Sequence, residues 1–389
     1  MLDVSVLYGG LETPSTPHRY GRAITQIDPP PHQRMAVAAS AAERRPIVVW
    51  NITRTCNLKC VHCYLGENEE RFLGGDEMTT AKVFEVIDQI TEAGCLYLTI
   101  TNGDPLMRRD FPDVYRYAKE AGLLVTVMCD GVLVNEKIVD LFSELPPDAV
   151  EVSVYGATAE TYEKITRVRG SFKHCLRGIR SLVDAGFQVR LKTVLMTLNA
   201  HEGELMRELA ADFDLPMRMD GAIFPCLHTG DMRPMDLRVP PKELVQIELA
   251  DPKTVASWIE YLDKPAPEAP VDKLYVCGAG VTGFYIDPYG YLYPCMMTTR
   301  YRYNLHESDF QTLWSEKLGE LHAKKPRAEY ECAGCELQRA CASCPGFHDQ
   351  EHGAEDLKSE YVCDTAKARW RALRQRSATL SGHSVERGL

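Results

Sequence analysis

The sequence lacks the features typical of membrane proteins, nucleic-acid-binding proteins and the common hydrolases. Its 389 residues contain no apolar run of about 18 residues and no hydrophobic amino-terminal stretch that would direct secretion. Acidic residues (55) outnumber basic residues (44), and the resulting net charge of -11 is poorly suited to phosphate backbones. No Gly-x-Ser-x-Gly, phosphate-loop or His-Glu-x-x-His motif occurs. We therefore expect a cytoplasmic protein that binds neither membranes nor nucleic acid.

The composition is that of a packed globular protein, with 45% apolar and 25% charged residues. At roughly 150 residues per domain, the chain has room for two or three domains. Proline and polar residues dominate the amino-terminal part and recur between two regions of regular pattern. The predicted segments are a lead-in (1–46), an α/β domain (47–235), a linker or helical bridge (236–276) and a cysteine-rich domain (277–389).

Six short β-rich runs alternate with helical patterns in the α/β segment, and this alternation predicts parallel βαβ units. The predicted strands are 47–52, 96–101, 123–128, 149–154, 189–195 and 217–223. The clearest predicted helix begins after Thr79 or Thr80, buries Val83, Val86, Ile87 and Ile90, and ends before Gly94. Six units give a partial barrel or an open wound sheet. Both folds bind ligands at the carboxyl ends of their strands.

Fourteen cysteines in a chain without an export signal indicate metal sites rather than disulfides. Three thiols fall in one loop directly after the first predicted strand, with the spacing C-x3-C-x2-C: Cys56, Cys60 and Cys63. Three ligands leave one coordination position open, as catalytic metal sites do. The alternative is a structural zinc loop that takes His62 as its fourth ligand. Cys95, Cys129, Cys175 and Cys226 are scattered, and we expect them to be small buried residues.

This loop resembles the signature of the radical S-adenosylmethionine (radical SAM) superfamily, whose fold is a partial (βα)6 barrel. The resemblance implies that the three thiolates hold a [4Fe-4S] cluster and that S-adenosylmethionine occupies the fourth iron. Reductive cleavage of that cofactor would give a 5'-deoxyadenosyl radical that abstracts hydrogen from the substrate. An electron donor such as flavodoxin or ferredoxin is also implied. The cofactor-binding positions that match the family are His62, Asn102, Gly103 and Asp104 after the second strand, Ser153 on the fourth strand, and Lys192 on the fifth.

Seven further cysteines follow between residues 277 and 363, more than one metal site needs. Their pattern resembles the SPASM extension, which carries one or two auxiliary iron-sulfur clusters; a pair of zinc sites is the alternative. The resemblance implies a complete cluster on Cys332, Cys335, Cys341 and Cys363. It implies a second cluster on Cys277, Cys295 and Cys344, whose fourth ligand is a side chain, a water or the substrate. Gly290 is predicted to form a turn with positive φ between two short strands.

The resemblance favours an enzyme that modifies a ribosomally made precursor peptide through a crosslink, an epimerisation or an oxidation. Since the amino-terminal segment is short, a separate leader-recognition protein is an expected partner. The stretch Pro46–Thr53 also looks like haem-pathway members of the superfamily, which alter porphyrin side chains. The noncatalytic alternative is an iron-sulfur electron carrier, which would not require Gly103, Asp104 and Ser153 in register with successive strands.

Overall fold

The computed structural model describes residues 46–66, 76–264 and 272–380. The predicted lead-in therefore lies outside the described residues, apart from Pro46. The described chain forms two compact units, one of residues 46–239 and 279–321 and the other of residues 240–278 and 322–380. The boundaries of the four segments predicted from the sequence stay a prediction.

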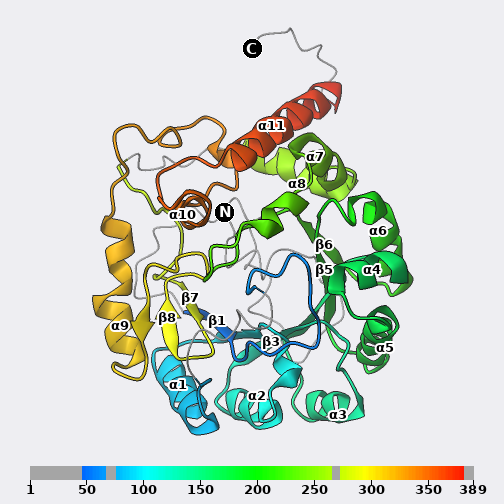
Figure 1. Ribbon diagram of the computed structural model, residues 1–389, viewed down its shortest axis with the longest axis vertical. Helices are drawn as coiled ribbons and strands as arrows, with labels where there is room; N and C mark the ends of the chain where they lie inside the picture. Colours follow the sequence, from blue (N-terminus) through cyan, green and yellow to red (C-terminus); the bar gives the residue numbers. More distant parts are fainter. Residues whose placement is uncertain (1–45, 67–75, 265–271, 381–389) are drawn as a thin grey trace. The chain divides into compact units, whose positions relative to one another are not determined.

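The first unit is built on an open sheet whose strands follow the order β6-β5-β4-β3-β2-β1-β7-β8-β9. All neighbouring pairs from β1 to β6 are parallel. These strands are β1 (Ile47–Asn51), β2 (Tyr97–Thr101), β3 (Leu124–Cys129), β4 (Ala149–Ser153), β5 (Val189–Val194) and β6 (Met217–Asp220). The predicted partial (βα)6 barrel is confirmed, since the parallel strands curve around one side of an open centre (Figure 1).

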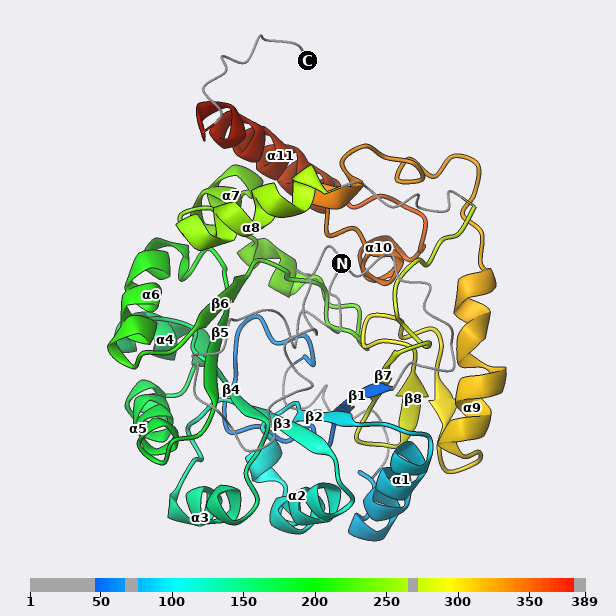
Figure 2. The same ribbon diagram turned by 180° about the vertical axis from the view of Figure 1, so that it is seen from behind.

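Helices cover the outer face of this curved sheet, as Figures 1 and 2 show. They are α1 (Thr80–Glu92), α2 (Phe111–Glu120), α3 (Glu136–Glu144), α4 (Ala159–Thr166), α5 (Ser171–Asp184) and α6 (Gly203–Asp212). Thr79 caps α1 by accepting a hydrogen bond from the Lys82 N–H at 3.3 Å, and Gly94 follows the helix at φ +86°. The four predicted apolar residues of this helix are all buried. Amphipathic helices over β-branched strands thus form the core.

Three short strands extend the sheet beyond β1: β7 (Gly283–Ile286), β8 (Tyr291–Tyr293) and β9 (Tyr303–Asn304). β7 pairs with β1 in parallel, and β8 and β9 follow in antiparallel order. Gly290 forms the predicted turn between β7 and β8 at φ +86°. A Cβ atom there would lie 2.7 Å from His306 Nε2, so both the backbone angle and the space favour glycine. Helix α9 (Phe310–Glu316) follows.

The second unit contains α7 (Pro241–Glu248), α8 (Pro252–Asp263), α10 (Pro345–His352) and α11 (Glu360–Leu380). Arg369 on α11 joins three parts of this unit. Its Nε donates to Glu248 Oε1 at 2.9 Å, and its Nη1 donates to the Ala340 carbonyl at 2.6 Å. Arg339 donates to the carbonyls of Leu262 and Lys264 at the end of α8. These bonds hold the cysteine-bearing loop between the helices in place.

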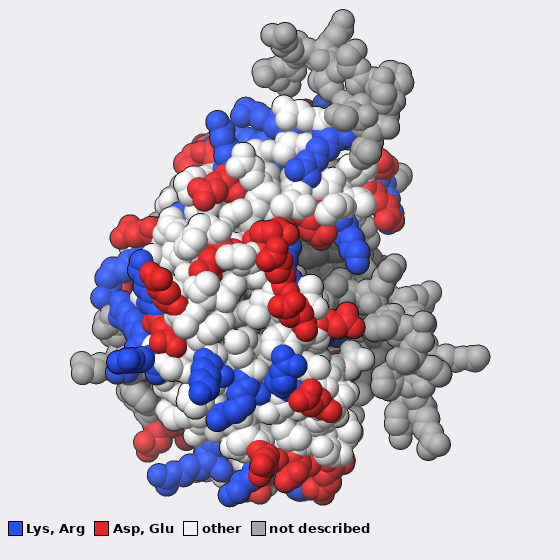
Figure 3. Space-filling view, turned by 90° about the vertical axis from the view of Figure 1, so that its right-hand side faces the viewer, with Lys and Arg blue, Asp and Glu red and all other residues white. Residues whose placement is uncertain are grey.

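Acidic and basic side chains are interspersed on the face drawn in Figure 3, and neither sign covers it. Within the described ranges, no helix combines the length and apolar character needed to cross a lipid bilayer.

Candidate functional site

The loop that carries the first three cysteines leaves β1 at its carboxyl end and lies inside the curve of the sheet, drawn in blue in Figure 1. Its main chain is fixed by neighbouring segments. The N–H groups of Lys59 and Val61 donate to the carbonyls of Thr166 and Ile165 at 2.9 and 3.0 Å. The Leu227 N–H donates to the Tyr64 carbonyl at 2.9 Å. The second half of the loop is therefore held by segments far away in sequence.

Cys56, Cys60 and Cys63 are half-buried. The four scattered cysteines are buried, as predicted for packing residues. In the described part of the chain, no three His, Cys, Asp or Glu side chains converge closely enough to hold a single metal ion. A [4Fe-4S] cluster is a larger group than one ion and is held by cysteine thiolates. The donor set and accessibility of this loop fit such a cluster.

The residues after β2 pack directly against the cysteine loop. The Asp104 N–H donates to the Thr55 carbonyl at 2.9 Å. Gly103 has φ +46°, and a Cβ atom there would lie 2.1 Å from the Thr55 carbonyl oxygen. Asn102 also has a positive φ of 77° and accepts a hydrogen bond from the Tyr64 hydroxyl at 3.2 Å. Only glycine allows the two loops to approach this closely.

The other predicted cofactor-binding residues follow the inner rim of the sheet. His62 is buried against Tyr155, with ring centroids 4.6 Å apart, and burial lowers the pKa of His62 to about 4. Its ring is therefore neutral at neutral pH. Ser153 and Lys192 are register partners on β4 and β5. Burial lowers the pKa of Lys192 to about 8, although Glu151 lies 3.8 Å away and opposes that shift.

Several buried polar atoms around the strand ends have no hydrogen-bond partner among the described residues. They are the three side-chain nitrogens of Arg54, His62 Nδ1, Asn102 Nδ2, Asp130 Oδ2, Glu151 Oε2 and Arg218 Nε. Native proteins leave few such atoms unpaired. A zwitterionic nucleoside such as S-adenosylmethionine carries the amino, carboxylate and ring groups that could pair with donors and acceptors of this kind. This part of the unit therefore fits the cofactor.

Sequence reasoning did not single out Arg54, Asp130, Glu151 or Arg218. Glu151 and Arg218 lie on strands of the parallel sheet, Asp130 directly follows β3, and Arg54 lies three residues after the end of β1. Position at a strand end is a usable signal in such folds. It cannot, however, distinguish a residue whose polar atoms are paired within the protein from one whose atoms are not.

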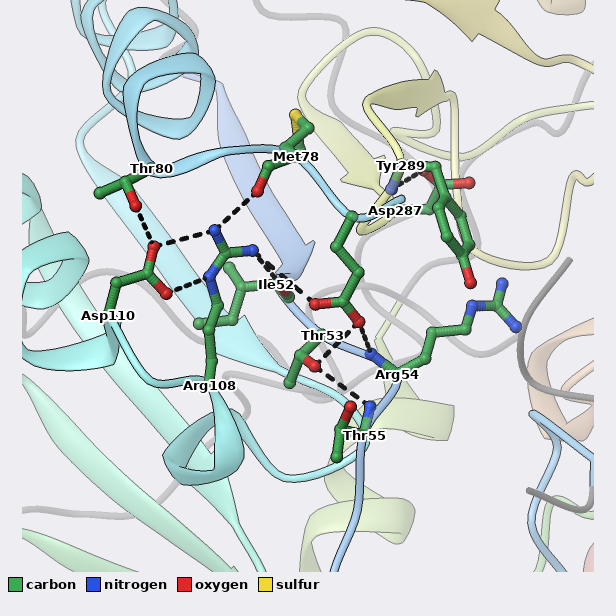
Figure 4. Close-up of polar contacts among 11 residues, drawn as sticks. Ile52, Thr53, Arg54, Thr55, Met78, Thr80, Arg108, Asp110, Asp287 and Tyr289 are labelled. Carbon is green, nitrogen blue, oxygen red and sulfur yellow. Dashed lines mark hydrogen bonds and ion pairs between the residues drawn. The ribbon is translucent and has the colours of Figure 1, made fainter. Parts of the chain in front are cut away.

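A buried arginine, Arg108, secures the elements beside the cysteine loop (Figure 4). It donates to the Ile52 and Met78 carbonyls at 2.7 and 2.8 Å and pairs with Asp110 at 2.7 Å. Asp110 also accepts from the Thr80 hydroxyl at 2.6 Å. These contacts tie the end of β1 to the beginnings of α1 and α2.

The second unit contains a cavity of about 350 Å³ lined by Cys277, Cys332, Cys335, Cys341, Cys344 and Cys363. Burial raises the pKa of the Cys332 and Cys341 thiols. Metal binding would displace their protons, because the thiolate is the ligand. Six thiols around one cavity fit iron-sulfur ligation. The structure thus brings together six of the seven predicted auxiliary ligands.

Cys295 does not line this cavity. It lies just after β8 in the first unit, where it is 6% exposed. Its N–H donates to the Thr298 hydroxyl oxygen at 3.0 Å, and the Thr298 N–H donates back to the Cys295 carbonyl at 3.0 Å. The predicted grouping of Cys295 with Cys277 and Cys344 therefore stays a prediction.

Two family descriptions match the chain. Residues 50–214 match the radical SAM superfamily, and residues 277–336 match the SPASM iron-sulfur cluster-binding domain. The first range contains the cysteine loop and the residues around the strand ends described above, apart from Arg218. The second range contains four cysteines: Cys277, Cys295, Cys332 and Cys335.

The chain is similar to proteins of two functional groups. Fe-coproporphyrin III synthase of Methanosarcina barkeri is 33% identical over 55% of this chain, and the match spans only half of that protein. AdoMet-dependent heme synthase of the same organism is 24% identical, with 77% of this chain and 90% of that protein covered. Mycofactocin maturase MftC of Mycobacterium tuberculosis is 25% identical, with 76% of each chain covered.

The fold is also found in the crystal structure of Streptococcus suis SuiB bound to the precursor peptide SuiA. The TM-score is 0.66 at 14% identity, with 82% of this chain and 76% of SuiB covered. SuiB has also been crystallised with S-adenosylmethionine. At this level of identity the likeness shows a shared fold.

Proposed function

We propose that this chain, which belongs to the radical SAM superfamily and carries a SPASM iron-sulfur domain, modifies a ribosomally made precursor peptide. The half-buried thiols of Cys56, Cys60 and Cys63 would hold the [4Fe-4S] cluster. Together, the bound cluster and S-adenosylmethionine supply one-electron chemistry that abstracts hydrogen from an unactivated carbon. The protein binds, orients and shields the reactants.

The chain's own residues divide this work. Gly103 lets the loop after β2 contact the cysteine loop, so the residues after β2 would hold the cofactor beside the three cysteines. The neutral His62 ring offers a flat, uncharged surface beside Tyr155. Ser153 and Lys192 would present a hydroxyl and an ammonium group from adjacent strands. The cavity cysteines of the second unit would hold the auxiliary clusters.

A peptide substrate is supported by two similarities, one in sequence and one in fold. The match to a mycofactocin maturase extends over three-quarters of each chain, and the fold is that of SuiB, which has been crystallised with a precursor peptide. An enzyme of this kind needs an external electron donor. A separate leader-recognition protein remains part of the proposal.

The second candidate function is modification of a porphyrin side chain. It is favoured by the 33% identity to Fe-coproporphyrin III synthase and by the long match to a heme synthase. Both functions would use the same cysteine loop. They differ in the molecule that must fit beside it.

Anaerobically reconstituted protein, supplied with S-adenosylmethionine and reduced flavodoxin, tests the proposal. Candidate peptides encoded beside the gene and iron-coproporphyrin III are added separately, and 5'-deoxyadenosine and modified product are measured. Stimulation by a peptide, with a mass change in that peptide, supports the leading function. Product formation from the porphyrin alone would replace it with the second function. The Cys56, Cys60, Cys63 triple alanine variant is the control.

A further inference from the structure

Arg54 lies two residues before Cys56 and is 0% exposed. Its main-chain N–H donates to Glu77 Oε1 at 2.7 Å. Its side chain extends toward Tyr289, whose ring centroid lies 5.5 Å from the guanidinium carbon (Figure 4). Among the described residues, none of the three guanidinium nitrogens has a hydrogen-bond partner. A buried arginine stays protonated and is strongly unfavourable unless its donors are paired.

Arg108 provides a direct comparison in the same view. Arg108 is also buried, and it donates to the carbonyl of Ile52, the residue directly after β1. It also donates to the Met78 carbonyl and to the Asp110 carboxylate. The fold can therefore satisfy a buried guanidinium at this place. Among the described residues, Arg54 meets an aromatic face but no acceptor, which points to a partner from outside this part of the chain.

Among the described residues, no carboxylate accepts a hydrogen bond from the Arg54 guanidinium. Asp287 is close enough to be influenced by Arg54, but its carboxylate already accepts from the Tyr289 N–H at 2.9 Å and the Tyr293 hydroxyl at 2.9 Å. Burial, together with the charges of Arg54 and Arg302, lowers the pKa of His228 to about 3, so His228 adds no positive charge at neutral pH. The Tyr285 hydroxyl remains neutral, because burial raises its pKa.

We propose that the Arg54 guanidinium binds a carboxylate of the reacting molecules beside the cysteine loop. The planar, two-pronged guanidinium matches a carboxylate, and such a pair forms two parallel charge-assisted hydrogen bonds. The proposal rests on the proposed function, because it takes the inside of the sheet as the reaction site. The carboxylate belongs either to S-adenosylmethionine or to the substrate, which would then be a carboxylate-bearing molecule.

Binding measurements on reconstituted full-length protein test this proposal without depending on turnover. Arg54→Gln and Arg54→Lys are compared with Arg116→Gln, which changes a partly exposed arginine paired with Glu144. The probes are S-adenosylmethionine and its decarboxylated form, followed by N-acetylalanine and N-acetylalaninamide on cofactor-saturated protein. Each pair differs in the carboxylate. Dissociation constants are measured by calorimetry.

If Arg54 binds the cofactor, Arg54→Gln weakens the binding of S-adenosylmethionine at least tenfold, to the affinity of the decarboxylated form. The affinity for the decarboxylated form itself is unchanged. If Arg54 binds the substrate, cofactor affinity stays within twofold and the preference for N-acetylalanine over its amide disappears. Arg54→Lys keeps the positive charge but not the planar pair of donors, so its affinities should lie between those of the wild type and Arg54→Gln. The proposal is overturned if both Arg54 variants keep both carboxylate preferences. Failure of the wild type to cleave its cofactor would instead refute the proposed function.

Discussion

The Oδ2 atom of Asp104 accepts a hydrogen bond from the main-chain N–H of Asp130 at 2.8 Å. Its Oδ1 atom accepts from the Leu106 N–H at 2.8 Å, so one fully buried carboxyl group joins the ends of β2 and β3. Burial and the nearby Asp130 carboxylate raise the pKa of Asp104. The predicted contact between Asp104 and the cofactor would have to use an oxygen that already accepts one main-chain bond.

This arrangement predicts that Asp104→Asn destabilises the protein. The amide keeps one acceptor but presents a donor to one of the two N–H groups, leaving that group unpaired. The free energy of unfolding should fall by about 1–3 kcal/mol, measured by urea denaturation. Asp140→Asn, which changes an exposed aspartate on α3, should have an effect below about 0.5 kcal/mol. Equal effects in both variants would contradict the structural role of Asp104.

Gly103→Ala should disturb the site far more than Gly94→Ala. Both glycines have positive φ, so both substitutions add backbone strain of about 1–3 kcal/mol. A Cβ atom at Gly94 meets nothing within 4 Å, whereas at Gly103 it meets the Thr55 carbonyl oxygen at 2.1 Å. We expect only Gly103→Ala to weaken S-adenosylmethionine binding, by more than tenfold. Calorimetric titration of both reconstituted variants measures this, and equal affinities would show that the loop contact is dispensable.

The strands and the cysteine loop could be predicted because their signals are local. Runs such as Ile47–Trp50 are rich in apolar and β-branched residues, which is typical of strands buried on both faces. The cap at Thr79 and the turn at Gly290 depend on a few neighbouring residues, and both are confirmed. Helix α4 was not predicted, because its eight residues carry only two large apolar side chains, Tyr162 and Ile165.

Nonlocal relationships could not be predicted in the same way. Strands β7 to β9 fall in the cysteine-rich part of the sequence, but β7 pairs with β1 more than 200 residues earlier. The composition of a four-residue strand does not specify its partner. Likewise, nothing in the sequence distinguishes Arg54 from Arg108, because the difference is whether folding brings carbonyls and a carboxylate to the guanidinium.

Glu202 should make the stability of the first unit depend on pH. Its carboxylate is 4% exposed and accepts from the Thr158 hydroxyl at 2.6 Å, the Thr161 hydroxyl at 2.5 Å and the Ala157 N–H at 2.7 Å. Although burial acts in the opposite direction, these bonds hold the pKa of Glu202 below its usual range. The stabilisation is therefore present above the unfolded pKa of about 4.3 and is lost as pH falls through the lower, folded value.

Glu202→Gln should consequently melt below the wild type at neutral pH, with the difference shrinking as the pH falls below about 4. The melting temperatures of the two proteins, compared at each pH, test this prediction. Protonation of other carboxyl groups affects both proteins alike and cancels in the difference. A gap between the two melting temperatures that stays constant down to pH 3 would contradict the assignment.

The Cys56, Cys60, Cys63 triple alanine variant should lose about four irons and four sulfides per chain after anaerobic reconstitution. It should lose all reductive cleavage of S-adenosylmethionine, because its three thiols would be the ligands of the catalytic cluster. The second-unit cysteines are untouched, so the remaining iron should match one or two further clusters. Replacement of Cys95, Cys129 and Cys175, which are buried, is the matched control. Undiminished cofactor cleavage in the first variant would refute the function.

The six cysteines that line the cavity of the second unit exceed the four that one [4Fe-4S] cluster requires. If Cys332, Cys335, Cys341 and Cys363 hold one cluster, then Cys277 and Cys344 would be ligands of another. Cys332→Ala and Cys344→Ala should each remove about four irons, and the double variant about eight. A double variant that loses no more iron than either single variant would mean that the cavity holds one shared cluster. Cofactor cleavage without substrate should persist in Cys344→Ala, because the cysteine loop after β1 is unchanged, whereas product formation should be lost.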